Sequence, residues 1–147
     1  MNGEPNMLDR DWRRSLAGAG CLVVMMQAAS LFAGDASAVH VPFDSDGVQR
    51  AALEADSYRF SPTHLVVRAG QPVELVFTSL TWLVPHNVVI DDPRSGLTIR
   101  AEIPAGARMT VRFTPAVTGA FAIYCDKKLL FFESHREKGM EGVLEVR

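Results

Sequence analysis

The chain has 147 residues, of which 48% are hydrophobic, 22% charged and 8% aromatic. This composition suits one globular domain with a sizeable core and excludes a disordered chain. The net charge of −2 provides no basic surface for a nucleic acid. Two cysteines and four histidines are too few for a zinc finger, an iron–sulfur cluster, a disulfide framework or a trinuclear copper centre. Any metal site must therefore be small.

The first 38 residues carry the pattern of an export signal. Arg13 and Arg14 precede residues 15–34, which contain no charged side chain, and residues 36–38 read Ala-Ser-Ala. This order is typical of a secretory signal peptide, so we predict cleavage after residue 38 and a periplasmic product. The arginine pair also resembles a twin-arginine signal, which leaves both export routes open. An uncleaved segment would instead anchor the chain, because the run approaches the roughly 20 residues that span a bilayer.

Cleavage would remove Cys21 and leave Cys125 as the one cysteine of the mature domain. Exported proteins fold in compartments where thiols usually pair as disulfides. An unpaired Cys125 would therefore be the partner in an intermolecular disulfide, a reactive thiol or a metal ligand.

Short apolar runs separated by turn residues follow the signal. Residues 39–55 form a lead that contains the first expected strand, and residues 56–147 form the main domain. The strands are expected at residues 51–55, 64–68, 73–77, 87–90, 97–99, 109–113, 121–124 and 142–146. About eight short strands at near-regular spacing predict an all-β sandwich or barrel. Residues 126–138 contain neither Gly nor Pro, which allows a short helix there.

Four side chains that can bind a soft metal stand near the ends of expected strands. Cys125 follows the strand at 121–124, and His135 and Met140 come after it; His86 precedes another strand. Two imidazoles, a thiolate and a thioether are the ligand set of blue-copper electron-transfer sites. Thiolate and thioether favour Cu(I), whereas imidazole suits both oxidation states. The residues therefore predict one mononuclear copper ion, although Cys125 and Met140 taken singly could be core side chains.

Over residues 56–147 the chain resembles the cupredoxins, the superfamily of plastocyanin, azurin and pseudoazurin. The resemblance is carried by an ordered series of motifs: Phe60-Ser-Pro62 with Val66 and Gly70, His86-Asn87, Phe113-Thr-Pro115, Thr118-Gly-Ala-Phe121, Tyr124-Cys125, His135 and Gly139-Met-Glu-Gly142. It implies a Greek-key β-sandwich with copper held by His86, Cys125 and His135. Met140 would be a weak axial ligand, and Asn87 would link the two ligand-bearing loops.

The resemblance also implies a function. A cupredoxin carries single electrons between periplasmic redox proteins, such as a cytochrome or a copper enzyme, and is not itself an enzyme. The same ligand set would serve a periplasmic copper-binding protein for delivery, buffering or resistance, so this alternative stays open.

The segment between two of the ligands departs from the familiar cupredoxins. Residues 126–134 separate Cys125 from His135, where those proteins have only a few residues. Closing a longer loop costs only about 0.6 kcal/mol per doubling of its length, so the insertion is tolerable if it bulges outward. It leaves open whether the copper geometry is blue, green or red. It also carries Glu133, whose carboxylate could complete a different copper site with an open position.

The inserted loop contains four consecutive apolar side chains: Leu129, Leu130, Phe131 and Phe132. One interpretation is an apolar helix face packed on the sandwich. The other is an exposed patch beside His135 where a redox partner docks, because such partners meet through small, weak interfaces. Basic residues would then steer an acidic partner: Lys127, Lys128, Arg136 and Lys138. Trp82 and Leu83 are expected to be lid or core residues near the site.

Overall fold

The computed structural model describes residues 37–93 and 95–147, and this part of the chain contains ten strands and no helix. In chain order the strands are β1 Val39–His40, β2 Gln49–Asp56, β3 Arg59–Ser61, β4 His64–Val67, β5 Val73–Ser79, β6 His86–Asp92, β7 Leu97–Ile103, β8 Arg108–Phe113, β9 Gly119–Tyr124 and β10 Glu141–Val146. Every expected strand overlaps one of these, and β1 and β3 are short additions at sheet edges.

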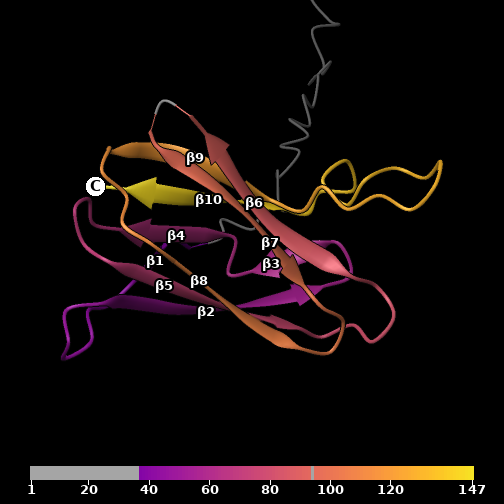
Figure 1. Ribbon diagram of the computed structural model, residues 1–147, viewed down its shortest axis with the longest axis horizontal. Helices are drawn as coiled ribbons and strands as arrows, with labels where there is room; N and C mark the ends of the chain where they lie inside the picture. The colour runs from indigo at the N-terminus through magenta and orange to yellow at the C-terminus, as the bar shows by residue number, and fades with distance from the viewer. Residues whose placement is uncertain (1–36, 94) are drawn as a thin grey trace, which may run out of the picture. The chain divides into compact units, whose positions relative to one another are not determined.

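The strands form two sheets that face each other across one core (Figure 1). One sheet has six strands in the order β1-β4-β10-β9-β6-β7, and the other has four in the order β3-β2-β5-β8. The prediction of an all-β sandwich is confirmed. Residues 1–36, which hold most of the predicted signal peptide, lie outside the described residues. Within the described ranges, no helix is long and apolar enough to cross a membrane.

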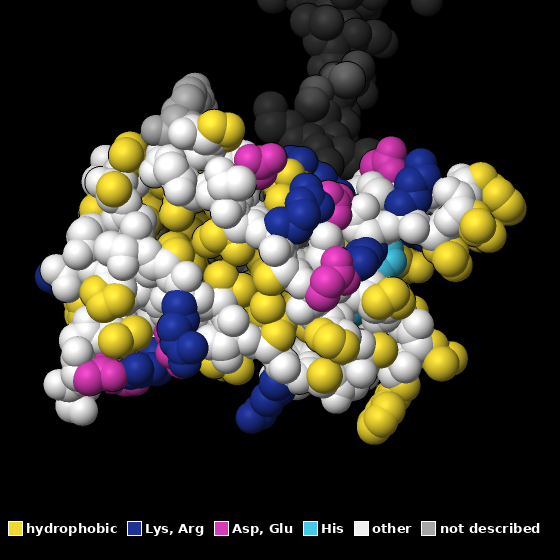
Figure 2. Space-filling model, in the orientation of Figure 1, with side chains coloured by type: hydrophobic (Ala, Val, Ile, Leu, Met, Phe, Trp, Pro, Cys, Tyr) yellow, Lys and Arg dark blue, Asp and Glu magenta, His cyan; other side chains and the backbone are white. Residues whose placement is uncertain are grey.

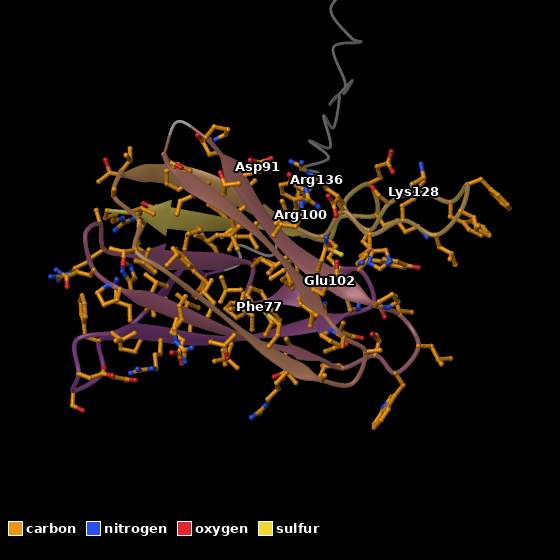
Figure 3. All side chains as sticks on the ribbon, viewed as in Figure 1. Phe77, Asp91, Arg100, Glu102, Lys128 and Arg136 are labelled. Carbon is orange, nitrogen blue, oxygen red and sulfur yellow. The ribbon has the colours of Figure 1, made fainter. Side chains whose placement is uncertain are left out.

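The burial pattern of each strand reflects its place in the sandwich. In β5, Val73, Leu75 and Phe77 are buried while the residues between them are only partly covered, as a strand with one core face requires. Phe77 lies between the two sheets in Figure 3. Burying such a side chain stabilises the fold by about 1.5–3 kcal/mol. In β6, which lies between β7 and β9, residues 86–90 are by contrast all buried, so both faces of this strand are covered at its start.

The topology of the larger sheet brings three distant segments to one end. β9 and β10 are antiparallel with Tyr124 opposite Glu141, so the end of β9 lies beside the start of β10. β6 pairs with β9 through Val89 and Tyr124, which places the start of β6 next to them. Gly142 lets β10 approach the chain before β4, since a Cβ at this position would lie 2.5 Å from the carbonyl oxygen of Thr63.

The short helix allowed within residues 126–138 does not form. The backbone N–H of His135 donates to the carbonyl of Lys127 (2.8 Å). This hydrogen bond joins the two ends of the inserted loop, and we call it the neck of the loop. Between these residues the N–H of Phe132 donates to the carbonyl of Leu129 (3.0 Å) in a single turn, and Leu130 has a φ of 51°, which a right-handed helix cannot contain. A second turn follows the neck and ends at Gly139, whose φ of 93° cannot continue a right-handed helix.

Candidate metal centre

Three of the predicted ligand residues converge at one end of the sandwich. His86 opens β6, Cys125 follows β9, and His135 begins the turn that leads to β10. One ligand atom from each residue lies within 4.8 Å of the others. All three residues are buried, and His86 and Cys125 are completely so. Two imidazoles and a thiolate at this separation can hold one soft metal ion.

A chain of hydrogen bonds holds His86 in one orientation. Its Nε2 lies 3.0 Å from Oγ1 of Thr81, and that hydroxyl donates to the carbonyl of Val84 (2.7 Å). Because the hydroxyl proton is used in this way, Nε2 carries the imidazole proton and Nδ1 keeps its lone pair. Nδ1 is buried and has no hydrogen-bond partner among the described residues. A buried acceptor without a partner is costly, and a metal ion would satisfy it.

The electrostatics of the site keep both imidazoles neutral. Burial, with a smaller effect from nearby His135, lowers the pKa of His86 from its ordinary 6.5 to about 4. Burial also lowers the pKa of His135, and Lys138 and Lys127 add to this effect. Neutral imidazole is the form that binds a metal, so both rings are ready to act as ligands at pH 7.

Cys125 is an unbridged thiol at the centre of the group. Its Sγ accepts a hydrogen bond from the backbone N–H of Asn87 (3.4 Å) and lies 3.4 Å from Nδ1 of His135. Burial raises the pKa of the thiol. A bound metal ion opposes that effect, because it favours the thiolate over the thiol.

Asn87 ties together the strand ends that carry His86 and Cys125. Its Nδ2 donates to Oδ1 of Asp126 (2.7 Å), and its Oδ1 accepts from the backbone N–H of Asp126 (3.1 Å). Arg100 extends this link by donating to the other carboxylate oxygen of Asp126 (2.6 Å). These bonds are of the kind that the resemblance implies for Asn87, and they fix the backbone on both sides of the sulfur.

A single closed turn delivers His135 and Met140. At its start, Oγ of Ser134 accepts from the N–H of Glu137 (3.2 Å), and the Glu137 carboxylate accepts from the N–H of Ser134 (2.6 Å), which forms a capping box. At its end, Gly139 adopts positive φ and the N–H of Met140 donates to the carbonyl of His135 (2.9 Å), as in a Schellman motif. Both ends of the turn are therefore locked without any metal.

Met140 and Glu133 were the two candidates for a further ligand. Met140 is fully buried, and its carbonyl accepts a hydrogen bond from the N–H of Cys125 (3.1 Å). Glu133 is exposed and does not belong to the group of converging ligand atoms. The backbone of Met140 thus lies beside Cys125, and its sulfur stays a predicted ligand, whereas Glu133 lies outside the converging group.

A pocket of about 370 Å³ opens beside His135. Its apolar walls come from two loops, one with Leu83 and Pro85 and the other with Leu129 and Phe132. The inserted loop projects beyond the sheets in Figures 1 and 3, with Lys128 on it. Figure 2 shows hydrophobic side chains projecting at this end of the domain.

The apolar side chains of the two loops face solvent. The exposed fractions are 66%, 76%, 83% and 51% for Leu129, Leu130, Phe131 and Phe132. The interpretation of this loop as a packed helix face is therefore wrong. Trp82 and Leu83 are 84% and 93% exposed, so they are not core residues either.

Two residues that contact the candidate ligands were not predicted from the sequence. Thr81 orients His86 from within the same loop, and a hydroxyl residue shortly before a candidate ligand could have drawn attention to it. Tyr58 lies edge-on to His135, with ring centroids 5.1 Å apart. No local signal marks Tyr58, because it comes from the other sheet, at the turn between β2 and β3.

Comparisons with known proteins agree with this fold. A family model described as a cupredoxin-like domain matches residues 20–142. No curated protein sequence matches the chain. Among solved structures, the metal-binding domain of the Cu(I)-exporting P-type ATPase CopA of Streptococcus pneumoniae D39 is 20% identical, with a TM-score of 0.55 over 76% of this chain and 97% of that one.

Two further structures have similar folds. Auracyanin A, a "blue" copper protein of Chloroflexus aurantiacus, is 18% identical, with a TM-score of 0.54 over 69% of this chain and 100% of that one. A multicopper oxidase is 18% identical, with a TM-score of 0.56 over 73% of this chain and 45% of that one. At these identities the likeness concerns the fold alone.

Proposed function

Because the chain belongs to the cupredoxin-like family, we propose that it binds one copper ion and carries single electrons. Auracyanin A, which has a similar fold, is a "blue" copper protein, and the His–Cys–His group of this chain fits one copper ion. His86, Cys125 and His135 are the proposed strong ligands, and Met140 is the proposed weak axial ligand. Copper, when bound, supplies the chemistry by cycling between Cu(II) and Cu(I).

The observation that carries the proposal is the buried nitrogen–nitrogen–sulfur group with an unpartnered Nδ1 on His86. The protein holds these donor atoms by its own hydrogen bonds, from Thr81 to His86 and from Asn87 to Asp126. A donor set held in this way changes little when the charge of the ion changes, which favours fast electron transfer. The pocket beside His135 supports an electron route through that imidazole.

We further propose that the protein works in the periplasm and is not an enzyme. The export signal predicted in the sequence supports this location. The similarity to a multicopper oxidase extends over less than half of that chain, so it does not argue for oxidase activity here. The proposed partners are periplasmic redox proteins such as a cytochrome or a copper enzyme.

The visible spectrum of the copper-loaded protein tests the function. We expect one equivalent of Cu(II) to produce an intense thiolate-to-copper absorption band in the full chain with Cys21→Ser, in which Cys125 is the single thiol. The wavelength of the band then ranks blue, green and red geometries. The band should bleach on reduction and return on oxidation. A chain that is folded by circular dichroism but shows no band would contradict the carrier function.

Copper delivery is the second candidate, because the fold is also that of the metal-binding domain of a Cu(I)-exporting ATPase. A carrier retains its ion through many redox cycles, whereas a delivery protein passes Cu(I) to an acceptor. To decide between the two functions, the Cu(I) form is incubated with a metal-free copper-binding protein. The two proteins are then separated, and the copper content of each protein is measured. We expect the ion to stay with this chain.

The exposed side chains of Leu129, Leu130, Phe131 and Phe132 form the proposed partner surface. Two neighbouring cations are already paired, Lys127 with Glu102 (2.6 Å) and Arg136 with Glu141 (3.4 Å). Lys128 has no ion pair with any described residue, so it can pair with an acidic partner. Apolar contact is therefore the proposed main source of affinity, and the charges serve mostly for steering.

Replacing Phe131 and Phe132 by Ser should slow electron transfer to a soluble c-type cytochrome by about 10-fold, as a loss of roughly 1.4 kcal/mol in docking would do. Stopped-flow mixing of the reduced protein with the oxidised cytochrome gives the rate. Phe43→Ser is the matched control, because Phe43 is also exposed but belongs to the lead before β2. Oxidation by ferricyanide should be equally fast in all variants. If the rate of electron transfer to the cytochrome is unchanged in the double variant, this loop is not the surface that binds the partner.

A further inference from the structure

A tyrosine from the second sheet covers one of the proposed copper ligands. Tyr58 stands at the turn between β2 and β3, and its ring meets that of His135 edge-on at 5.1 Å and 78°. His135 reaches the same place from the turn before β10, in the first sheet. The contact therefore joins the two sheets directly at the metal centre.

Lys138 also contacts the ring of Tyr58. Its Nζ lies 4.4 Å from the centroid of the Tyr58 ring, within the range of a cation–π interaction. The same Nζ donates a hydrogen bond to Oη of Tyr58 (3.3 Å). Lys138 and His135 belong to the same closed turn, so Tyr58 contacts the ligand-bearing segment through both residues.

The two imidazoles are oriented in different ways. His86 has its Nε2 bonded to Thr81, which fixes its ring plane. No hydrogen bond from the described residues reaches Nε2 of His135, so its ring lacks that support. Metal-binding histidines usually have an outer partner that sets their orientation. For His135 the ring of Tyr58 is placed to take this role.

The backbone around Tyr58 forms a tight turn. Ser57, directly before Tyr58, has a φ of 44°, in the left-handed region that side chains other than glycine rarely adopt. Asp56 pairs with Arg59, so Ser57 and Tyr58 are the two loop residues of the β2–β3 hairpin, and a positive φ at the first of them is usual in such a loop. This tight loop places the ring of Tyr58 against that of His135.

We propose that Tyr58 is a positioning residue for His135: it sets the plane of the imidazole and, with Lys138, shields its outer edge. This inference rests on the proposed copper site, because its purpose is to hold a ligand ring ready for the ion. Tyr58 and His135 both line the pocket, so the tyrosine forms part of the pocket wall next to the imidazole. It makes no bond to the metal in this proposal.

The first test needs no copper. In the metal-free full chain with Cys21→Ser, the ring protons of His135 should be shifted by the neighbouring aromatic ring in NMR spectra. Tyr58→Phe should keep that shift, whereas Tyr58→Leu should abolish it while retaining apolar bulk. Lys128→Gln is the control for charge, because Lys128 lines the same pocket without contacting Tyr58. Identical His135 signals in the Leu variant and the parent would overturn the proposal.

The second test measures how firmly the ion is held. We expect Tyr58→Leu to release copper to an excess of a chelator about 10-fold faster than the parent, as loss of an outer partner of a ligand does. Tyr58→Phe should stay within about twofold, since it lacks only the hydroxyl contact with Lys138. Equal release rates for Tyr58→Leu and the parent would also overturn the proposal. If the chain binds no copper, the proposed function fails, and the NMR test still decides the role of Tyr58.

Discussion

Replacing Cys125 by Ser abolishes the visible absorption band of the copper-loaded protein and lowers its affinity for the ion. The band requires a thiolate bonded to Cu(II), and a serine hydroxyl neither ionises at pH 7 nor offers a soft donor. Cys125 lies within 4.8 Å of both imidazoles and is the one cysteine of the described domain. The expected result is therefore complete loss of the band in a Cys21→Ser background.

The measurement is an absorption titration with Cu(II) on the metal-free full chain. Met140→Leu serves as the matched control, because it conserves volume in the same buried region and keeps the thiolate, so it should retain an intense band. Thermal unfolding of the metal-free Ser variant checks that the fold survives. A band of undiminished intensity in the Ser variant would mean that copper is bound by other residues.

The metal-free protein loses stability on mild acidification. The pKa of His86 is about 4 in the folded chain, against 6.5 when the imidazole is exposed. Between these values the unfolded state binds a proton that the folded state does not, so the free energy of unfolding falls as the pH falls. The stability contributed by neutral His86 is fully present above pH 6.5. From pH 7 to about pH 4.5 the loss should be about 2–3 kcal/mol, at 1.36 kcal/mol per pKa unit.

Urea unfolding of the metal-free full chain at these two pH values measures the loss. The lowered pKa of His135 acts in the same direction. His86→Gln removes the main titrating group while keeping a polar side chain, so its stability should depend less on pH in this range. An equally steep dependence in that variant would show that other groups cause the acid sensitivity.

Local patterns account for the elements and for the choice of candidate ligands. The strands are predictable because alternating burial and turn residues are properties of short segments, as in Val73, Leu75 and Phe77 of β5. His86, Cys125 and His135 stand out because soft and imidazole donors are rare in this chain. Their assignment to copper stays a proposal, but the structure brings their ligand atoms together.

The inserted loop shows where local reasoning failed. The absence of Gly and Pro in residues 126–138 allowed a helix, yet the loop closes through the bond from His135 to Lys127, and Leu130 adopts a positive φ that a helix cannot contain. The neck exists because the ligand turn must return to the sheet end where Cys125 lies. The exposure of Phe131 follows from the same closure, since the loop is held away from the sandwich.

The all-β class and the residues that qualify as soft-metal ligands follow from the amino-acid sequence, because both depend on residue types and short-range order. The contacts that support these residues follow instead from the way the two sheets pack. The proton on Nε2 of His86 depends on Thr81 and Val84, and the ring of His135 depends on Tyr58 from the opposite sheet. Such contacts join segments through the pairing of sheets, and no pattern within one segment records which distant side chain will meet it.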